Sequence, residues 1–103
     1  MVWTLCRQLS PHVSFERPVL SQLLRAGTSV GANICEAQYA ESRKDFVHKL
    51  KIAEKELAEL TYWLDIITTR PRLATSDDLA LIVDKTVNVR RMLAAAIRTA
   101  KER

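Results

Sequence analysis

Apolar residues recur at alternating spacings of three and four residues along three long stretches of the chain, about residues 16–40, 42–69 and 76–101. This spacing places the apolar side chains on one face of an α-helix. Each stretch is therefore predicted to form a long amphipathic helix. The repeating positions, mostly apolar or small, are Leu20, Leu23, Gly27, Val30, Ile34 and Ala37 in the first stretch, Phe46, Leu50, Ala53, Leu57, Leu60, Leu64 and Ile67 in the second, and Leu79, Ile82, Thr86, Val89, Leu93, Ala96 and Ala100 in the third.

Residues that favour helix ends support these bounds. Pro18 suits the first turn of a helix, because the amide hydrogen that proline lacks has no partner there. Ser42 followed by Asp45 resembles a capping box, with aspartate in place of the usual glutamate. Pro71 marks the end of the second long helix. A shorter apolar pattern over residues 2–9 predicts a short additional helix at the start of the chain.

Long helices of similar length joined by short connections pack side by side in alternating directions. The length of 103 residues suits a single domain. The fold class predicted for residues 1–103 is therefore all-α, an antiparallel up-down four-helix bundle with a short or truncated first helix. Isolated helices gain little stability in water, so the apolar faces must bury against one another.

The chain has only two glycines, Gly27 and Gly31, and they lie four residues apart in the first long stretch. A glycine inside a helix costs about 1 kcal/mol relative to alanine. Two glycines on one helical face predict a smooth strip against which another helix packs closely. The alternatives are two tolerated glycines or a kink in the helix.

A polar row follows one edge of the same apolar face and includes Arg25, Asn33 and Glu36. Arg25 and Glu36 lie about 16 Å apart along a helix, which is too far for them to pair with each other. A half-buried charge without a partner is costly. Each charge is therefore expected to pair with another helix or another chain, unless both side chains simply reach solvent.

The second long helix carries more apolar surface near its end than one buried face requires. Trp63 and Ile66 lie beside the repeating positions, and Glu59 flanks them. A helix that is apolar almost all round is normally buried on more than one side. These three residues are predicted to contact a second subunit. The alternative is that the start of the chain and the loop over residues 70–75 cover them.

The chain has a net charge of +4, and basic residues concentrate toward its end. A segment rich in basic side chains attracts phosphate groups. The candidate nucleic-acid contacts are Arg90, Arg91, Arg98, Lys101 and Arg103. Basic residues in a last helical turn also complement the helix dipole. This alternative accounts for Arg98, Lys101 and Arg103, but it does not account for Arg90 and Arg91.

No residue pattern indicates catalysis, so the chain is not expected to be an enzyme or to hold a metal or a cofactor. His48 follows Asp45 by one helical turn, but a metal site needs three or four converging ligands. No apolar run reaches the roughly 20 residues of a membrane span, and the first residues lack the pattern of a signal peptide. A cytoplasmic protein without membrane contact is expected.

Two stretches of the chain together resemble a known family. Residues 23–37 read LLRAGTSVGANICEA, and residues 41–67 read ESRKDFVHKLKIAEKELAELTYWLDII. In order and spacing they resemble the bacterial four-helix-bundle proteins, also called 23S rRNA intervening-sequence proteins. The IRTAK of residues 97–101 resembles the ending of that family. Its first helix is longer than residues 2–9, so either this helix is shortened or Met1 is not the natural start.

Proteins of this family form five-fold rings, so the resemblance implies a homopentamer. Some members are encoded inside rRNA intervening sequences. A related group assists the reverse transcriptases of diversity-generating retroelements, where a basic surface binds nucleic acid. The resemblance thus implies RNA or DNA, a reverse transcriptase or a ribosomal component as the partner.

The leading hypothesis is a non-enzymatic, oligomeric helical scaffold that binds nucleic acid or a nucleoprotein partner. The alternative is a protein–protein interaction module with no role in nucleic-acid binding.

Overall fold

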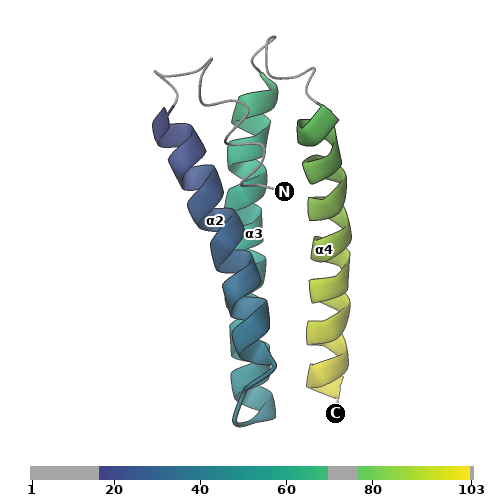
Figure 1. Cartoon of the computed structure of the whole chain (residues 1–103). Coiled ribbons are helices and arrows are strands. Elements are labelled where there is room, and N and C mark those ends of the chain that lie inside the picture. Colours follow the sequence, from purple (N-terminus) through teal and green to yellow (C-terminus); the bar gives the residue numbers. More distant parts are fainter. Residues whose placement is uncertain (1–16, 70–76, 103) are drawn as a thin grey trace.

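The computed structural model describes residues 17–69 and 77–102, and these residues form three long α-helices. They are α2 (Arg17–Ala37), α3 (Arg43–Thr68) and α4 (Asp77–Glu102). The helices run in alternating directions, and α3 packs against both of the others (Figure 1). The predicted all-α class and the three long helices are confirmed. The short helix predicted over residues 2–9 lies outside the described residues.

The start of α3 has the Ser42 cap that the sequence predicts, whereas Asp45 reaches the amide of Glu41 and not that of Ser42. The Ser42 hydroxyl accepts a hydrogen bond from the backbone amide of Asp45 at 3.0 Å. The Asp45 carboxylate accepts a hydrogen bond from the backbone amide of Glu41 at 3.4 Å. The Ser42 bond satisfies one of the amide groups that the first turn of a helix leaves without a partner. Ser42 is therefore the N-cap of α3.

The end of α2 comes earlier than the apolar pattern predicts, at Ala37 and not near residue 40. The amides of Gln38, Tyr39 and Ala40 each donate to the carbonyl three residues earlier. Bonds of this kind are tighter than those of an α-helix and often close its last turn. The chain then reverses into α3 over residues 38–42.

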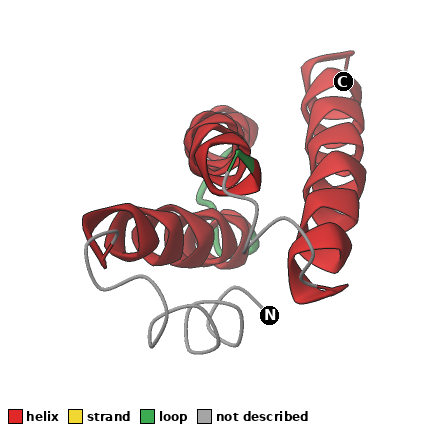
Figure 2. Ribbon diagram, turned by 90° about the horizontal axis from the view of Figure 1, so that it is seen from above, coloured by secondary structure: helices red, strands yellow, loops and turns green. Residues whose placement is uncertain are grey.

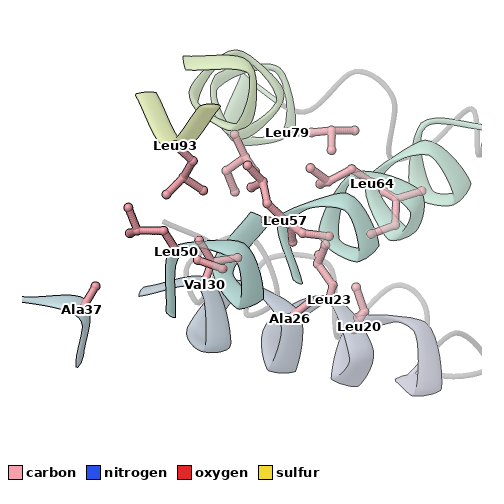
Figure 3. Packing of buried hydrophobic residues seen from close by; sticks show 14 of the residues in the cluster. Leu20, Leu23, Ala26, Val30, Ala37, Leu50, Leu57, Leu64, Leu79 and Leu93 are labelled. Carbon is pink, nitrogen blue, oxygen red and sulfur yellow. The ribbon is translucent and has the colours of Figure 1, made fainter. Parts of the chain in front are cut away.

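The predicted apolar positions of α3 form the centre of the core, and all of those from Leu50 to Ile67 are buried. Seen from above, the three helices do not lie in one plane (Figure 2). The close view shows leucines of all three helices around Leu57 (Figure 3). Burying one leucine or isoleucine contributes about 1.5–3 kcal/mol, so these residues dominate stability. The other buried apolar residues are Leu20, Leu23, Ala26, Val30 and Ala37 of α2, and Leu79, Ile82, Leu93 and Ile97 of α4.

The buried face of α2 differs from the predicted face at Gly27 and also at Ile34, which is only partly buried. Ala26 is fully buried, whereas its neighbour Gly27 is only half-buried. One residue turns a helix by about 100°, so a contact that includes Ala26 is rotated away from both glycines. The small residue at the centre of the buried face is therefore the alanine.

Candidate functional site

The residues predicted for helix packing and interfaces on α2 lie on two opposite edges of its buried face. Gly27 and Gly31 line a hollow that α4 also borders. Arg25 and Glu36 instead reach ion-pair partners on α3. The structure therefore does not bring these residues together into one site.

Arg25 is the main polar link between α2 and α3. Its guanidinium pairs with Glu56 at 3.2 Å and also with Glu59, while its Nε donates to Gln22 at 3.0 Å. The Arg25 side chain is 45% exposed, and surface ion pairs of this kind contribute up to about 1 kcal/mol each. The sequence left open whether Arg25 pairs with another helix or another chain, or reaches solvent. In the structure Arg25 pairs with another helix, α3.

Glu36 and Asn33 also find partners within the chain. The Glu36 carboxylate accepts a hydrogen bond from the Lys49 ammonium at 3.1 Å, which links the C-terminal end of α2 to α3. The Asn33 side-chain amide donates to the Ser29 carbonyl at 2.9 Å and to the Ser29 hydroxyl at 3.3 Å. These side chains are thus satisfied without a second chain, and their contact with one stays a prediction.

An apolar groove runs between α2 and α4 with α3 as its floor, and its upper part has a volume of about 260 Å³. A Cβ built on Gly31 would meet no atom within 4 Å. No helix of the described residues packs closely at Gly31, so close packing there stays a prediction. The lining residues are Gly27, Val30, Gly31 and Ile34 of α2, Leu57 and Leu60 of α3, and Ile82, Lys85, Thr86 and Val89 of α4.

Glu59, Trp63 and Ile66 follow one another along a single face of α3. Trp63 and Ile66 are half-buried, and Trp63 packs against the core. The buried indole N–H of Trp63 has no hydrogen-bond partner within the described part of the chain. A buried donor without a partner costs free energy. The N–H is enclosed, so it does not itself indicate a contact with another chain, and the contact of this face with a second subunit stays a prediction.

The candidate nucleic-acid contacts of α4 are all exposed, apart from Arg103, which lies outside the described residues. Arg91, Arg98 and Lys101 share one side of the helix because they are seven and three residues apart, and Arg90 is adjacent. None of the four forms an ion pair with another of the described residues. Their positive charges are therefore available to an anion.

Lys51 of α3 reaches the same surface, although the concentration of charge at the end of the sequence did not indicate it. The pKa of Lys101 is lowered from its ordinary value by a side-chain hydrogen bond with Lys51 and then by the positive charge of Lys51. Two exposed amines, one on each helix, thus lie near each other. The regular spacing of lysines along α3 was the available signal, but only packing shows which residues of α4 they meet.

The described ranges 17–69 and 77–102 contain no group of three or more His, Cys, Asp or Glu side chains that could hold a metal ion. Within the same ranges, no helix is long and apolar enough to cross a membrane.

Amphipathic helices in alternating directions around an apolar core define an all-α helical-bundle protein. A model of the family described as 23S rRNA-intervening sequence protein matches residues 2–95. The chain therefore belongs to the 23S rRNA-intervening sequence protein family, and the resemblance stated from the sequence is confirmed.

The chain is also similar to a protein of known structure, a protein of unknown function from the S23 ribosomal protein family of Bacteroides thetaiotaomicron. The two are 35% identical and superpose with a TM-score of 0.83. The similarity covers 93% of this chain and 87% of that chain. Among curated proteins, no sequence matches this chain.

Proposed function

We propose that this protein is a non-enzymatic helical scaffold that assembles with copies of itself and binds nucleic acid through the basic surface of α4. The observation that carries the proposal is the exposure of Arg90, Arg91, Arg98 and Lys101, which form no ion pair with other described residues. Such cations bind phosphates favourably, because binding releases the counterions that nucleic acid holds.

Family membership supports the same proposal. The family description refers to sequences that interrupt 23S rRNA, and family resemblance further supports a cytoplasmic homopentamer. Five chains of net charge +4 would together carry +20, which strengthens attraction to a polyanion. In this assembly residues 2–9 would supply the fourth helix of each bundle. The partner would be an RNA, a DNA, a ribosomal component or a reverse transcriptase.

The test is the salt dependence of binding to short fluorescent RNA and DNA oligonucleotides. The logarithm of the binding constant should fall linearly with the logarithm of the salt concentration. Arg98→Gln should weaken binding and reduce the slope by about 0.7–0.9, the value expected for one lost phosphate contact. Arg17→Gln removes the same charge at the start of α2 and is the matched control. Absence of binding at low salt, or an affinity that salt leaves unchanged, would contradict the proposal.

The second candidate function is a protein–protein interaction module, and the partial exposure of the apolar side chains of Trp63 and Ile66 favours it. In that case the face of Glu59, Trp63 and Ile66 would contact a different protein. Light scattering separates the two functions: a monomer that binds neither RNA nor DNA would favour the module.

A further inference from the structure

One exposed face of α3 is basic over about three turns. Lys44, His48, Lys51 and Lys55 follow one another at spacings of four, three and four residues, and all are exposed. These spacings place the four side chains on one side of the helix. None of them forms an ion pair with another of the described residues.

This face of α3 comes near the basic residues of α4 at Lys51, which lies close enough to Lys101 to lower its pKa. The two helices run in opposite directions side by side (Figure 1). Because the α4 cations share the side of Lys101, the two rows combine into one surface. We call this surface the basic strip, and its members are Lys44, His48, Lys51 and Lys55 of α3 with Arg90, Arg91, Arg98 and Lys101 of α4.

Two ammonium groups that lie near each other repel, so the nearness of Lys51 and Lys101 is unfavourable without an anion. Both side chains are exposed and accessible to a ligand. A phosphate group beside them would accept hydrogen bonds from both amines and neutralise part of their charge.

An exposed aromatic ring lies at the end of the basic strip. Tyr62 continues the face of Lys55 across the small side chain of Ala58, and it is 58% exposed. Its ring meets Trp63 edge-on, with the ring centres 5.0 Å apart, so its position is supported. The groove brings Leu60 beside Ile82 and Thr86, which places Tyr62 about level with Ile82, beyond the last cation of α4.

The charge of the surface changes from positive to negative near this ring. Asp65 of α3 and Asp84 of α4 continue the same two faces, and both are exposed. Their carboxylates repel phosphate, so they bound the strip at the end where Tyr62 lies. Glu54 is half-buried and lies close enough to Lys101 to raise the pKa of Lys101. This effect of Glu54 is smaller than the opposite effect of Lys51.

We propose that the basic strip binds a single-stranded nucleic acid, with phosphates along Lys51, Lys101 and Arg98 and one base stacked on Tyr62. This inference rests on the proposed nucleic-acid function and specifies the form of the ligand. A basic surface with an exposed aromatic ring is the combination that single strands require, because their bases are free to stack. A duplex keeps its bases stacked inside and gains nothing from the ring.

The experiment measures fluorescence anisotropy with an oligouridine of about 12 nucleotides and with an RNA duplex of the same length, at several salt concentrations. Tyr62→Ala should weaken binding of the single strand about tenfold without changing the salt slope, and Tyr62→Phe should retain the affinity. Lys51→Gln should weaken binding about threefold and reduce the slope by about 0.7. The matched controls are Tyr39→Ala, in the turn after α2, and Lys85→Gln, which faces the apolar groove.

The outcomes separate this inference from the function on which it rests. If Arg98→Gln weakens binding while Lys51→Gln and Tyr62→Ala behave as the wild type, the basic strip is wrong and the nucleic-acid function stands. Equal losses in the variants and in their controls would mean that only net charge matters, which also overturns the strip. If the wild type binds neither probe, both proposals fail. Circular dichroism checks that each variant remains helical.

Discussion

Ala26, Gly27 and Gly31 are three small residues of α2 with three different surroundings. Ala26 is fully buried in the core, and Gly27 is half-buried at the edge of the groove. Gly31 is exposed and has room for a side chain. A small residue therefore has a packing role within the described chain only at Ala26, and the sequence pattern alone does not distinguish the three positions.

Gly31→Ala is predicted to stabilise the chain by about 0.5–1 kcal/mol, because alanine restricts the unfolded chain and favours a helix. For a domain of this size the change corresponds to a rise of a few degrees in Tm, about 4–8 °C per kcal/mol. Thermal unfolding followed by circular dichroism measures it. Ala32→Gly, at the exposed neighbouring position, is the reverse control and should lower the Tm. A lower Tm for Gly31→Ala would reveal a contact at Gly31 that the described residues do not supply.

At the scale of elements, α3 connects the other two helices, and each of its sides has a different role. Its apolar positions fill the core between α2 and α4, and its acidic residues Glu56 and Glu59 hold Arg25 of α2. Its exposed lysines lie beside the cations of α4, where Lys51 lies near Lys101. This nearness of like charges is unfavourable, because the two ammonium groups repel each other.

Lys51→Gln is predicted to raise the stability slightly at neutral pH, because it removes the repulsion that lowers the pKa of Lys101. In the wild type, Lys101 holds its proton less tightly in the folded state than in the unfolded state, where its pKa is near the ordinary value of 10.5. The folded state thus loses this proton first, and stability rises with pH between the lowered pKa and 10.5.

Thermal unfolding at several pH values tests this prediction. The difference in Tm between Lys51→Gln and the wild type should shrink as the pH rises through the lowered pKa of Lys101, because the repulsion disappears from the wild type. Lys85→Gln, which removes an equal charge on the other side of α4, is the control. A loss of stability in Lys51→Gln at neutral pH would contradict the repulsion.

At the scale of the whole molecule, the three helices form a rod with extents of 48 × 19 × 17 Å. This shape leaves the groove between α2 and α4 open, and the Trp63 side chain is only half-buried among the described residues. A narrow bundle has much surface for its volume, so it gains stability when another surface covers its apolar parts. The proposed assembly with further copies would provide that cover.

Light scattering is predicted to give a mass several times the 11.7 kDa of one chain, and five times if the family resemblance holds. Gly31→Leu should reduce this mass if another chain packs against Gly31. A Cβ at this exposed position meets no atom within 4 Å, so the helical content should not change. Ala32→Leu places the same side chain at the next exposed position and should leave the mass unaltered. A monomeric wild type would contradict the assembly.

The sequence by itself determined the helical elements of this protein and most of its core. In a helix, apolar residues at spacings of three and four share one face. Ser42 and Asp45 indicate where α3 begins. These signals act between residues close in the chain, so a linear pattern contains them. The end of α2 at Ala37 was missed because the bonds that close its last turn depend on the reversal into α3.

Only the tertiary structure decided which residues of different helices meet. It placed Ala26 at the centre of the buried face of α2, paired Arg25 with Glu56 and Glu59, and brought Lys51 near Lys101. Each of these contacts depends on the relative rotation and offset of two helices. The packing of all their side chains sets that geometry, and no pattern within a single helix contains it.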